Sequence, residues 1–316
     1  MTRPPRLRLG ISSCLLGQKV RYDGDHKLDS FITGTLGKYF EFVPVCPEVA
    51  IGLGVPRPPI RLVGDPAAPR AVGVADPTLD VTTQLAAYGR RQARALDDIS
   101  GYIFKARSPS CGMERVQVYG AGGHVRRGRG VYAAALIARL PLLPVEEEDR
   151  LGDPVRRDNF LERVFAYRRW QALVGSGLTA SRLAEFHSAH TLALRAHGGQ
   201  EYRELGRLVA RATRRDTRRR GAEYIRLFMT ALKRRATRTR HAKVLQYVLG
   251  RLKQRLATAD KTELSGLIDS YRRGVLPLAV PVMRLRHHVR RRPDPWIATQ
   301  TYLYPDPREF LLRYRM

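Results

Sequence analysis

Three cysteines, the only ones in the chain, each follow an apolar run that is typical of a β-strand. The pairs of run and cysteine are residues 7–11 with Cys14, residues 42–45 with Cys46, and residues 102–105 with Cys111. Parallel strands of an open α/β sheet end at one shared edge, so residues far apart in the sequence meet there. We therefore expect the three thiols to converge. Three thiolates without a fourth protein ligand predict a metal centre with one open coordination position, where a substrate can bind.

The spacing of the cysteines is not itself a signature. Gaps of 32 and 65 residues match no local zinc or ferredoxin motif. The alternative is three buried cysteines that only pack against apolar neighbours. Glycine, serine or proline lies beside each of them, which is typical of loops and favours the metal site. An odd number of widely spaced cysteines also argues against a disulfide framework.

Residues 1–155 predict an α/β domain with a Rossmann-like, mostly parallel sheet. A fourth strand is expected near residues 143–145, and helices near residues 28–39, 76–96 and 131–140. Strands that alternate with helices build a parallel sheet with helices on its faces.

Two segments of this first domain, residues 51–62 and 120–130, are rich in glycine or proline. Such clusters interrupt helices and strands, so we interpret residues 51–62 as a loop, whereas residues 120–130 precede the helix expected at residues 131–140.

Residues 156–316 predict a mainly α-helical domain, because strand signals fade and helical periodicity takes over. The expected helices cover residues 159–173, 178–196, 200–213, 219–236, 240–257, 261–273 and 280–291. His187, His190 and His197 share one of them, but no cysteine or carboxylate completes a metal-ligand set, so we interpret them as structural. Trp170 and Trp296 are expected to anchor the core.

The charge of the chain is extreme, with 57 Lys and Arg against 29 Asp and Glu, a formal net charge of +28. Residues 1–170 hold 26 basic and 18 acidic side chains, whereas residues 171–316 hold 31 and 11. This asymmetry indicates a polyanionic partner for the second half. Nucleic acid is favoured over membrane because the basic helices lack a wide apolar face. A solvated, arginine-rich surface is the alternative.

The basic side chains that we expect to contact the phosphates of a nucleic acid form two runs, each near a helix junction. They are Arg211, Arg214, Arg215, Arg218 and Arg219, then Lys233, Arg234, Arg235 and Arg238.

The expected location is the cytoplasm, without membrane contact and without an obligate protein partner. No segment is apolar for the length that a bilayer requires. The basic N-terminus leads into a short strand and lacks the apolar core of a signal peptide.

Two polar side chains beside the cysteines are candidates for catalysis. Glu48 follows Cys46 in a Cys-Pro-Glu sequence and could accept a proton from water, although a glutamate also stabilises a helix N-terminus. Ser108 begins the Ser-Pro-Ser-Cys sequence that ends at Cys111, where a hydroxyl can relay protons or simply cap a turn.

The functions of four further polar residues near the cysteines stay open at this point. Turn and capping chemistry is the favoured interpretation for Ser12 and Ser13, and a turn is the simplest for Asp23. Ser110, in the same Ser-Pro-Ser-Cys sequence as Ser108, has no assigned role.

Five stretches in the first half of the chain together resemble the thiouracil desulfidase family. The similar stretches are residues 11–17, 20–24, 46–49, 52–57 and 105–112. The second half is similar to the helical domain that is fused to this family in bacterial tRNA 4-thiouridine desulfidases. The supporting residues there are Phe186, His187, His190, Tyr202, Leu205, Gly206, Thr237, Arg238, His241, Val244, Leu245, Tyr271, Arg272, Tyr302 and Leu303.

The resemblance implies a [4Fe-4S] cluster on Cys14, Cys46 and Cys111, with one iron free of protein ligands. It also implies that Glu48 and Ser108 assist a hydrolysis without redox change, in which water replaces the sulfur at C4 of 4-thiouridine in tRNA. Two alternatives remain. One is a desulfidase of free thiouracil or thionucleosides, and the other is a non-enzymatic iron–sulfur or zinc protein that binds nucleic acid and senses redox state.

Overall fold

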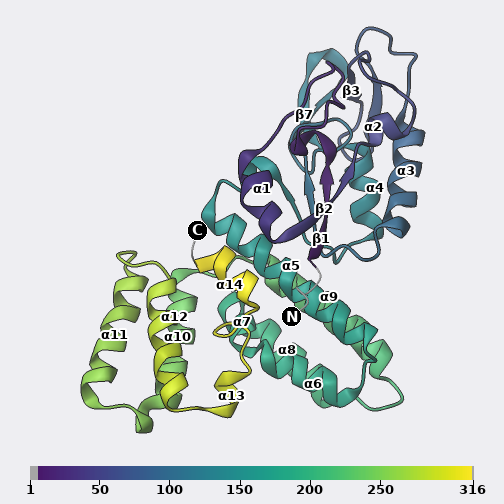
Figure 1. The fold of residues 1–316 in the computed structure, drawn as a ribbon. Coiled ribbons are helices and arrows are strands. Elements are labelled where there is room, and N and C mark those ends of the chain that lie inside the picture. The colour runs from purple at the N-terminus through teal and green to yellow at the C-terminus, as the bar shows by residue number, and fades with distance from the viewer. Residues whose placement is uncertain (1–5, 315–316) are drawn as a thin grey trace. The chain divides into compact units, whose positions relative to one another are not determined.

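The computed structural model describes residues 6–314. The chain divides into two compact units, Met1–Phe160 and Leu161–Met316. The first combines strands and helices, and the second is built from helices (Figure 1). The predicted fold class is therefore confirmed, and each unit is described by itself.

Sheet A forms the centre of the first unit and is parallel throughout. Its strands, in spatial order, are β2 (Phe40–Val45), β1 (Leu7–Ser12), β5 (Tyr102–Phe104) and β8 (Val145–Glu147). Leu9 and Ile11 of β1 are fully buried, which is expected for a strand that is covered on both faces. The predicted strands before each cysteine are all present.

Helices flank sheet A, as the alternation of elements predicted. They are α1 (Ser30–Gly34), α2 (Pro47–Ala50), α3 (Thr82–Ala95) and α4 (Val131–Arg139). Helices α3 and α4 pack side by side, and α1 lies on the other side of β1 and β2 (Figure 1). Gly89 of α3 permits this close packing, because a Cβ there would lie 2.8 Å from the Cβ of Ala135 and 2.9 Å from the carbonyl oxygen of Tyr132.

Sheet B corrects the interpretation of residues 51–62 as a loop, because residues 60–62 belong to one of its strands, and none of its strands was predicted. Its strands, in spatial order, are β4 (Arg70–Gly73), β3 (Ile60–Val63), β6 (Val116–Tyr119) and β7 (Val125–Gly128). Strands β3 and β6 are parallel, and the two outer pairs are antiparallel. Each strand has only four residues and several carry arginine, so their sequences show too little apolar alternation to predict a strand.

The second unit begins within α5 (Pro154–Gly175) and continues as a succession of helices. They are α6 (Ala180–Ala189), α7 (Thr191–His197), α8 (Gly199–Ala210), α9 (Thr217–Lys233), α10 (Arg238–Leu252), α11 (Thr258–Arg272), α12 (Ala279–Arg291), α13 (Pro295–Ala298) and α14 (Pro307–Tyr314). The single helix expected over residues 178–196 is divided at His190, and α13 and α14 were not predicted. Leu245, Val282 and Leu303 are among the fully buried residues of its main core.

Several histidines lie in the interior of this helical unit. His190 accepts a hydrogen bond from Nε of Arg169 at 3.0 Å, and His241 pairs through Nδ1 with the hydroxyl of Tyr302 at 2.8 Å. Burial lowers the pKa of His190 to about 3, and the cation of Arg169 adds to the effect. Burial also lowers the pKa of His241 to about 3. Both imidazoles are therefore neutral in the folded protein at physiological pH.

Among the residues that the structure describes, no helix has both the length and the apolar character to cross a membrane.

The close packing of α3 and α4 leads to a test of stability. Gly89→Ala should lower the free energy of unfolding by about 1–3 kcal/mol, because the added methyl group separates the two helices. Gly266→Ala on α11 is the matched control, because nothing lies within 4 Å of a Cβ at that position. The control should be neutral or up to about 1 kcal/mol more stable. Equal urea-unfolding midpoints for both variants would contradict this account.

The neutral buried histidines should make stability depend on pH. Their pKa values lie below the ordinary histidine value of 6.5, so the unfolded chain binds protons first and the folded state loses stability as the pH falls from 7 to 5. Each such histidine costs about 2 kcal/mol at pH 5. His241→Gln should reduce the difference in unfolding free energy between pH 7 and pH 5 by that amount. An unchanged difference would remove His241 from this explanation.

Candidate functional site

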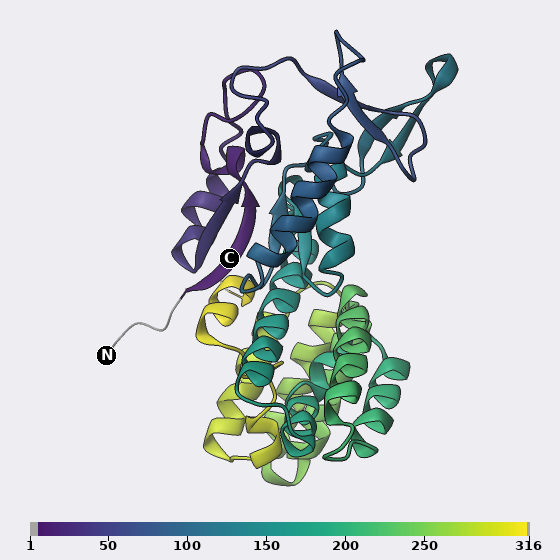
Figure 2. The same cartoon turned by 90° about the vertical axis from the view of Figure 1, so that its right-hand side faces the viewer.

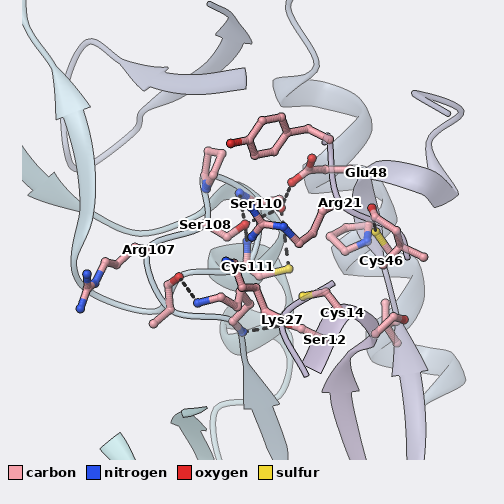
Figure 3. Close-up of a pocket in the computed structure, with 18 of the residues that line it drawn as sticks. Ser12, Cys14, Arg21, Lys27, Cys46, Glu48, Arg107, Ser108, Ser110 and Cys111 are labelled. Atoms are coloured by element: carbon pink, nitrogen blue, oxygen red, sulfur yellow. Dashed lines mark hydrogen bonds between the residues drawn. The ribbon is translucent and has the colours of Figure 1, made fainter. Parts of the chain in front are cut away.

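All three cysteines line one cavity of about 560 Å³ at the carboxyl ends of the sheet A strands (Figure 3). Glu48, Ser108 and Ser110 line the same cavity. The parallel pairing of β1 with β2 and β5 brings the three strand ends to one edge. The structure thus brings together the five residues that the sequence suggested for cofactor and catalysis.

The backbone after each strand places its cysteine. Cys14 lies in a 3₁₀ turn, Ser13–Leu16, that follows β1 directly, and Gly17 ends the turn with φ of 85°. Cys46 precedes α2 as its N-cap residue. The turn at Cys111 requires Gly112, because a Cβ there would lie 2.3 Å from Val116 and 2.9 Å from the carbonyl oxygen of Ser108.

The thiols are free and poorly accessible, since Cys14 and Cys111 are buried and Cys46 is partly so. Burial raises the pKa of Cys14 to about 11, which the cation of Lys105 partly opposes. Burial raises the pKa of Cys111 further, although a hydrogen bond from Ser12 opposes the shift. Thiols of this kind stay protonated until a metal replaces their protons.

The sulfur set fits a metal cluster better than a single ion. Three thiolates are soft ligands that select zinc, copper(I) or iron–sulfur centres. Thiolates on one tetrahedral zinc, at about 2.3 Å from it, lie roughly 3.8 Å apart. Within the described part of the chain, the three cysteine sulfur atoms do not all lie within 4.8 Å of one another. The wider spacing suits a cluster in which each thiolate binds a different metal ion.

Glu48 is held by a buried arginine that sequence analysis did not single out. Arg57 donates from Nη2 at 2.7 Å and from Nε at 3.0 Å to Oε2 of Glu48. Its Nη1 donates to the carbonyl oxygens of Val20 at 3.0 Å and Gly54 at 2.8 Å. The guanidinium therefore fixes both the carboxylate and the two loops that border the cavity.

The second carboxylate oxygen of Glu48, Oε1, is hydrogen-bonded to Ser110, the first of a pair of linked serines. Ser110 donates from Oγ to Oε1 of Glu48 at 2.5 Å, and its Oγ lies 3.0 Å from Oγ of Ser108. Ser108 accepts the backbone N–H groups of Ser110 and Cys111 at 3.3 and 3.1 Å. Because a hydroxyl has one proton and Ser110 gives its own to Glu48, Ser108 is left to donate to Ser110. The three side chains form a continuous path for a proton.

Cations surround the thiols and the carboxylate. Arg21, Lys27, Lys105 and Arg107 join Arg57 in the cavity lining. Asp23 orients Arg21 through hydrogen bonds of 2.8 and 3.1 Å, and the pKa of Asp23 falls to about 2 chiefly because of them. These charges oppose part of the rise in the pKa of the thiols, as Lys105 and Arg21 do for Cys14.

The two runs of basic residues expected to contact RNA occupy opposite ends of α9. Arg211 to Arg219 cover the turn between α8 and α9, and Lys233 to Arg238 cover the connection from α9 to α10. All nine named side chains are exposed. Some contact neighbours: Arg219 lies 3.7 Å from Asp216, and Arg234 pairs with Glu201. Helix α9 has 17 residues, so about 25 Å separates the two clusters.

Sequence reasoning assigned no role to Arg57 or to Ser110. Arg57 lies 9 residues beyond Glu48 in a loop that was considered only for its glycines and prolines. The one available signal was a lone arginine in an otherwise uncharged stretch, residues 49–60, within the segments that carry the family resemblance.

Comparisons with known proteins match each half of the chain to a family. Residues 9–148 match the family model described as 2-thiouracil desulfurase, and residues 192–307 match DUF1722, a family of unknown function. The uncharacterized protein YbgA of Escherichia coli K12 is 34% identical over 158 residues, which cover 50% of this chain and 94% of YbgA. The uncharacterized protein YbbK of Bacillus subtilis 168 is 30% identical over 132 residues, which cover 40% of this chain and 87% of YbbK.

Among solved structures, the chain is similar to the [4Fe-4S]-dependent thiouracil desulfidase TudS. The two sequences are 34% identical, the match covers 47% of this chain and 95% of TudS, and the TM-score is 0.38. The chain therefore belongs to the 2-thiouracil desulfurase family of sulfur-removing enzymes through residues 9–148, and it carries a DUF1722 domain in residues 192–307.

Proposed function

We propose that this protein is a tRNA 4-thiouridine desulfidase. Cys14, Cys46 and Cys111 hold a [4Fe-4S] cluster, the cofactor named for TudS. Water replaces the sulfur at C4 of the thiolated base, giving uridine and hydrogen sulfide. The water oxygen bonds to C4 as the carbon–sulfur bond breaks, and its two protons leave with the sulfide, so no electron donor or acceptor is needed. The reaction belongs in the cytoplasm, where tRNA is found.

One observation carries the proposal. Three cysteine thiols and a hydrogen-bonded carboxylate share a cavity of about 560 Å³, within the range for small-molecule sites. When bound, the cluster would supply an iron with an open position, a thiophilic Lewis acid for the thiocarbonyl sulfur.

The side chains of the cavity supply the proton transfers. Glu48, held by Arg57, accepts a proton from the attacking water. The hydrogen-bonded path through Ser110 and Ser108 then returns a proton toward the departing sulfide. The tight hydrogen bonds fix the carboxylate in one orientation, which keeps the acceptor atom aligned with the water.

The basic helical unit supports RNA as the substrate. A base within a folded RNA must leave its stack to enter the cavity, at a cost of a few kcal/mol. Phosphate contacts to the exposed arginines can offset that cost. The two clusters at the ends of α9 lie about 25 Å apart, a distance that a folded RNA can bridge and a mononucleotide cannot.

Free thiouracil is the second candidate substrate, and it is favoured by the similarity to the 2-thiouracil desulfurase family and to TudS, a thiouracil desulfidase. The test is anaerobic reconstitution with iron and sulfide, followed by incubation with 4-thiouridine-containing tRNA or with free thiouracil. Cluster-dependent loss of the thiouridine absorbance in tRNA, with a higher kcat/KM than for the free base, supports the proposal. Turnover of the free base alone would replace it with the second candidate.

Cofactor binding and proton transfer should separate in two variants. Cys14→Ala should lose both the brown colour of the cluster and the activity, because one of three iron ligands is missing. Glu48→Gln should keep the colour and lose about 10²–10⁴-fold in kcat, because the amide cannot accept the proton. Visible absorption and sulfide release measure the two effects. A fully active Glu48→Gln protein would remove Glu48 from the mechanism.

Arg57 should act by positioning Glu48. Arg57→Lys keeps the charge but cannot donate from two nitrogens to Oε2 while also reaching Val20 and Gly54. We expect roughly 10²-fold lower kcat with the cluster absorbance intact. Exposed Arg90→Lys on α3 is the control and should match the wild type. Wild-type kcat for Arg57→Lys would show that the guanidinium fork is dispensable.

A further inference from the structure

The outer face of sheet B gathers arginines beside the catalytic cavity. The register places Gln117 of β6 opposite Arg127 of β7, and Arg61 of β3 adjoins Gln117 on the other side. Tyr119 follows two residues after Gln117 and faces the same way. The alternate residues of these strands, such as Leu62 and Val118, are buried in a separate core. Packing of the hydrophobic core therefore does not explain why arginine and tyrosine side chains occupy the outer face.

A hollow of about 680 Å³ lies over this face. Its lining includes Arg61, Arg107, Arg115, Arg126 and Arg127, and contains no carboxylate. The guanidinium of Arg61 lies over the ring of Tyr119, 5.4 Å from its centroid. We call this hollow, with those five arginines and Tyr119, the arginine groove.

Part of the positive charge in the arginine groove is uncompensated. Arg115 is paired with Glu147 and Asp149, at 2.7 Å each, and Arg107 lies 3.6 Å from Asp149. Within the described residues, Arg126 and Arg127 form no ion pair, and both are exposed on the edge strand β7. The β6–β7 hairpin that carries them projects from the first unit (Figure 2).

The arginine groove adjoins the catalytic cavity. Ile60, Arg107 and Pro109 line both hollows. Arg107 points away from the three thiols (Figure 3), and its backbone has a positive φ of 61°, unusual for a residue other than glycine. A chain that lies in the arginine groove can therefore place one of its bases in the cavity without crossing a barrier of other elements.

We propose that the arginine groove binds the sugar–phosphate backbone of the RNA next to the thiolated nucleotide. The inference rests on the proposed function and adds a recognition surface on the catalytic unit itself. Arg126 and Arg127, which form no ion pair within the described residues, complement the charge of a run of phosphates. Tyr119 offers a face on which an unstacked neighbouring base can lie, as in proteins that bind single-stranded nucleic acid. The occupant is a polynucleotide, since the arginines spread over the two strands β3 and β7 and over the segments that follow β5 and precede β6.

The test compares substrates of one holoenzyme that differ in their phosphates. They are 4-thiouridine-containing tRNA, 4-thiouridine monophosphate and the free nucleoside. For Arg126→Gln/Arg127→Gln we expect KM for tRNA to rise about 10-fold, with an unchanged kcat/KM for the nucleoside. The slope of log affinity for tRNA against log salt should fall by about 2, one for each lost phosphate contact.

Arg90→Gln/Arg94→Gln on α3 is the matched control, because it removes the same charge from exposed positions of the same unit. A tRNA KM that is unchanged, or raised equally by the control, would overturn the inference. An equal loss for tRNA and nucleoside would indicate damage to the cavity and overturn it too. An equal rise for the monophosphate would show that one phosphate suffices and reject the polynucleotide.

The results for the wild-type enzyme distinguish a failure of the proposed function from a failure of the inference about the arginine groove. A wild-type holoenzyme that turns over the nucleoside but not tRNA would reject the proposed substrate, and the inference about the arginine groove with it. A wild-type enzyme that acts on tRNA, combined with an indifferent Arg126→Gln/Arg127→Gln variant, would reject the arginine groove alone.

Discussion

The parallel pairing of β1 with β2 and β5 is the constraint on which the site depends. Leu9 and Ile11 are fully buried, so the register of β1 cannot slip without exposing them. Gly10 lets the ring of Tyr102 pack against β1, because a Cβ there would lie 2.2 Å from that ring. With the strands locked in this way, the turns that follow them must meet. The three cysteines therefore converge as a consequence of strand pairing and burial.

The same arrangement couples the cofactor ligands to the carboxylate. Glu48 stands two residues after Cys46 on the short helix α2, so any shift of that cysteine also shifts the carboxylate. Arg57 limits such shifts, because its side chain is only 4% exposed and pairs with Glu48 at 2.7 Å. A buried pair of this kind contributes little net stability, but it strongly disfavours every other orientation of the carboxylate. The ion pair therefore matters for the position of the Glu48 carboxylate rather than for the stability of the fold.

The pattern of apolar residues in the sequence correctly predicted the helices and strands that are long or buried on both faces. The strands before Cys14, Cys46 and Cys111, the helices α3 and α4, and most helices of the second unit were all predicted. Sheet B was missed because its strands are short and carry polar residues on one face, as in Arg61 and Gln117. The helix over residues 178–196 was predicted as one piece, since the division at His190 leaves no break in the apolar pattern.

The sequence by itself determined which residues could form a metal site. Cysteines that follow apolar strands need only the regular pairing of those strands in a parallel sheet to be brought together. It also determined the charge asymmetry, which is simple composition. Only the tertiary structure decided that Arg57 holds Glu48, that Ser110 links Glu48 to Ser108, and that arginines from two strands and two connecting segments line one groove. Those contacts depend on the paths of loops and on the directions of side chains. No periodic pattern in the sequence predicts either of them.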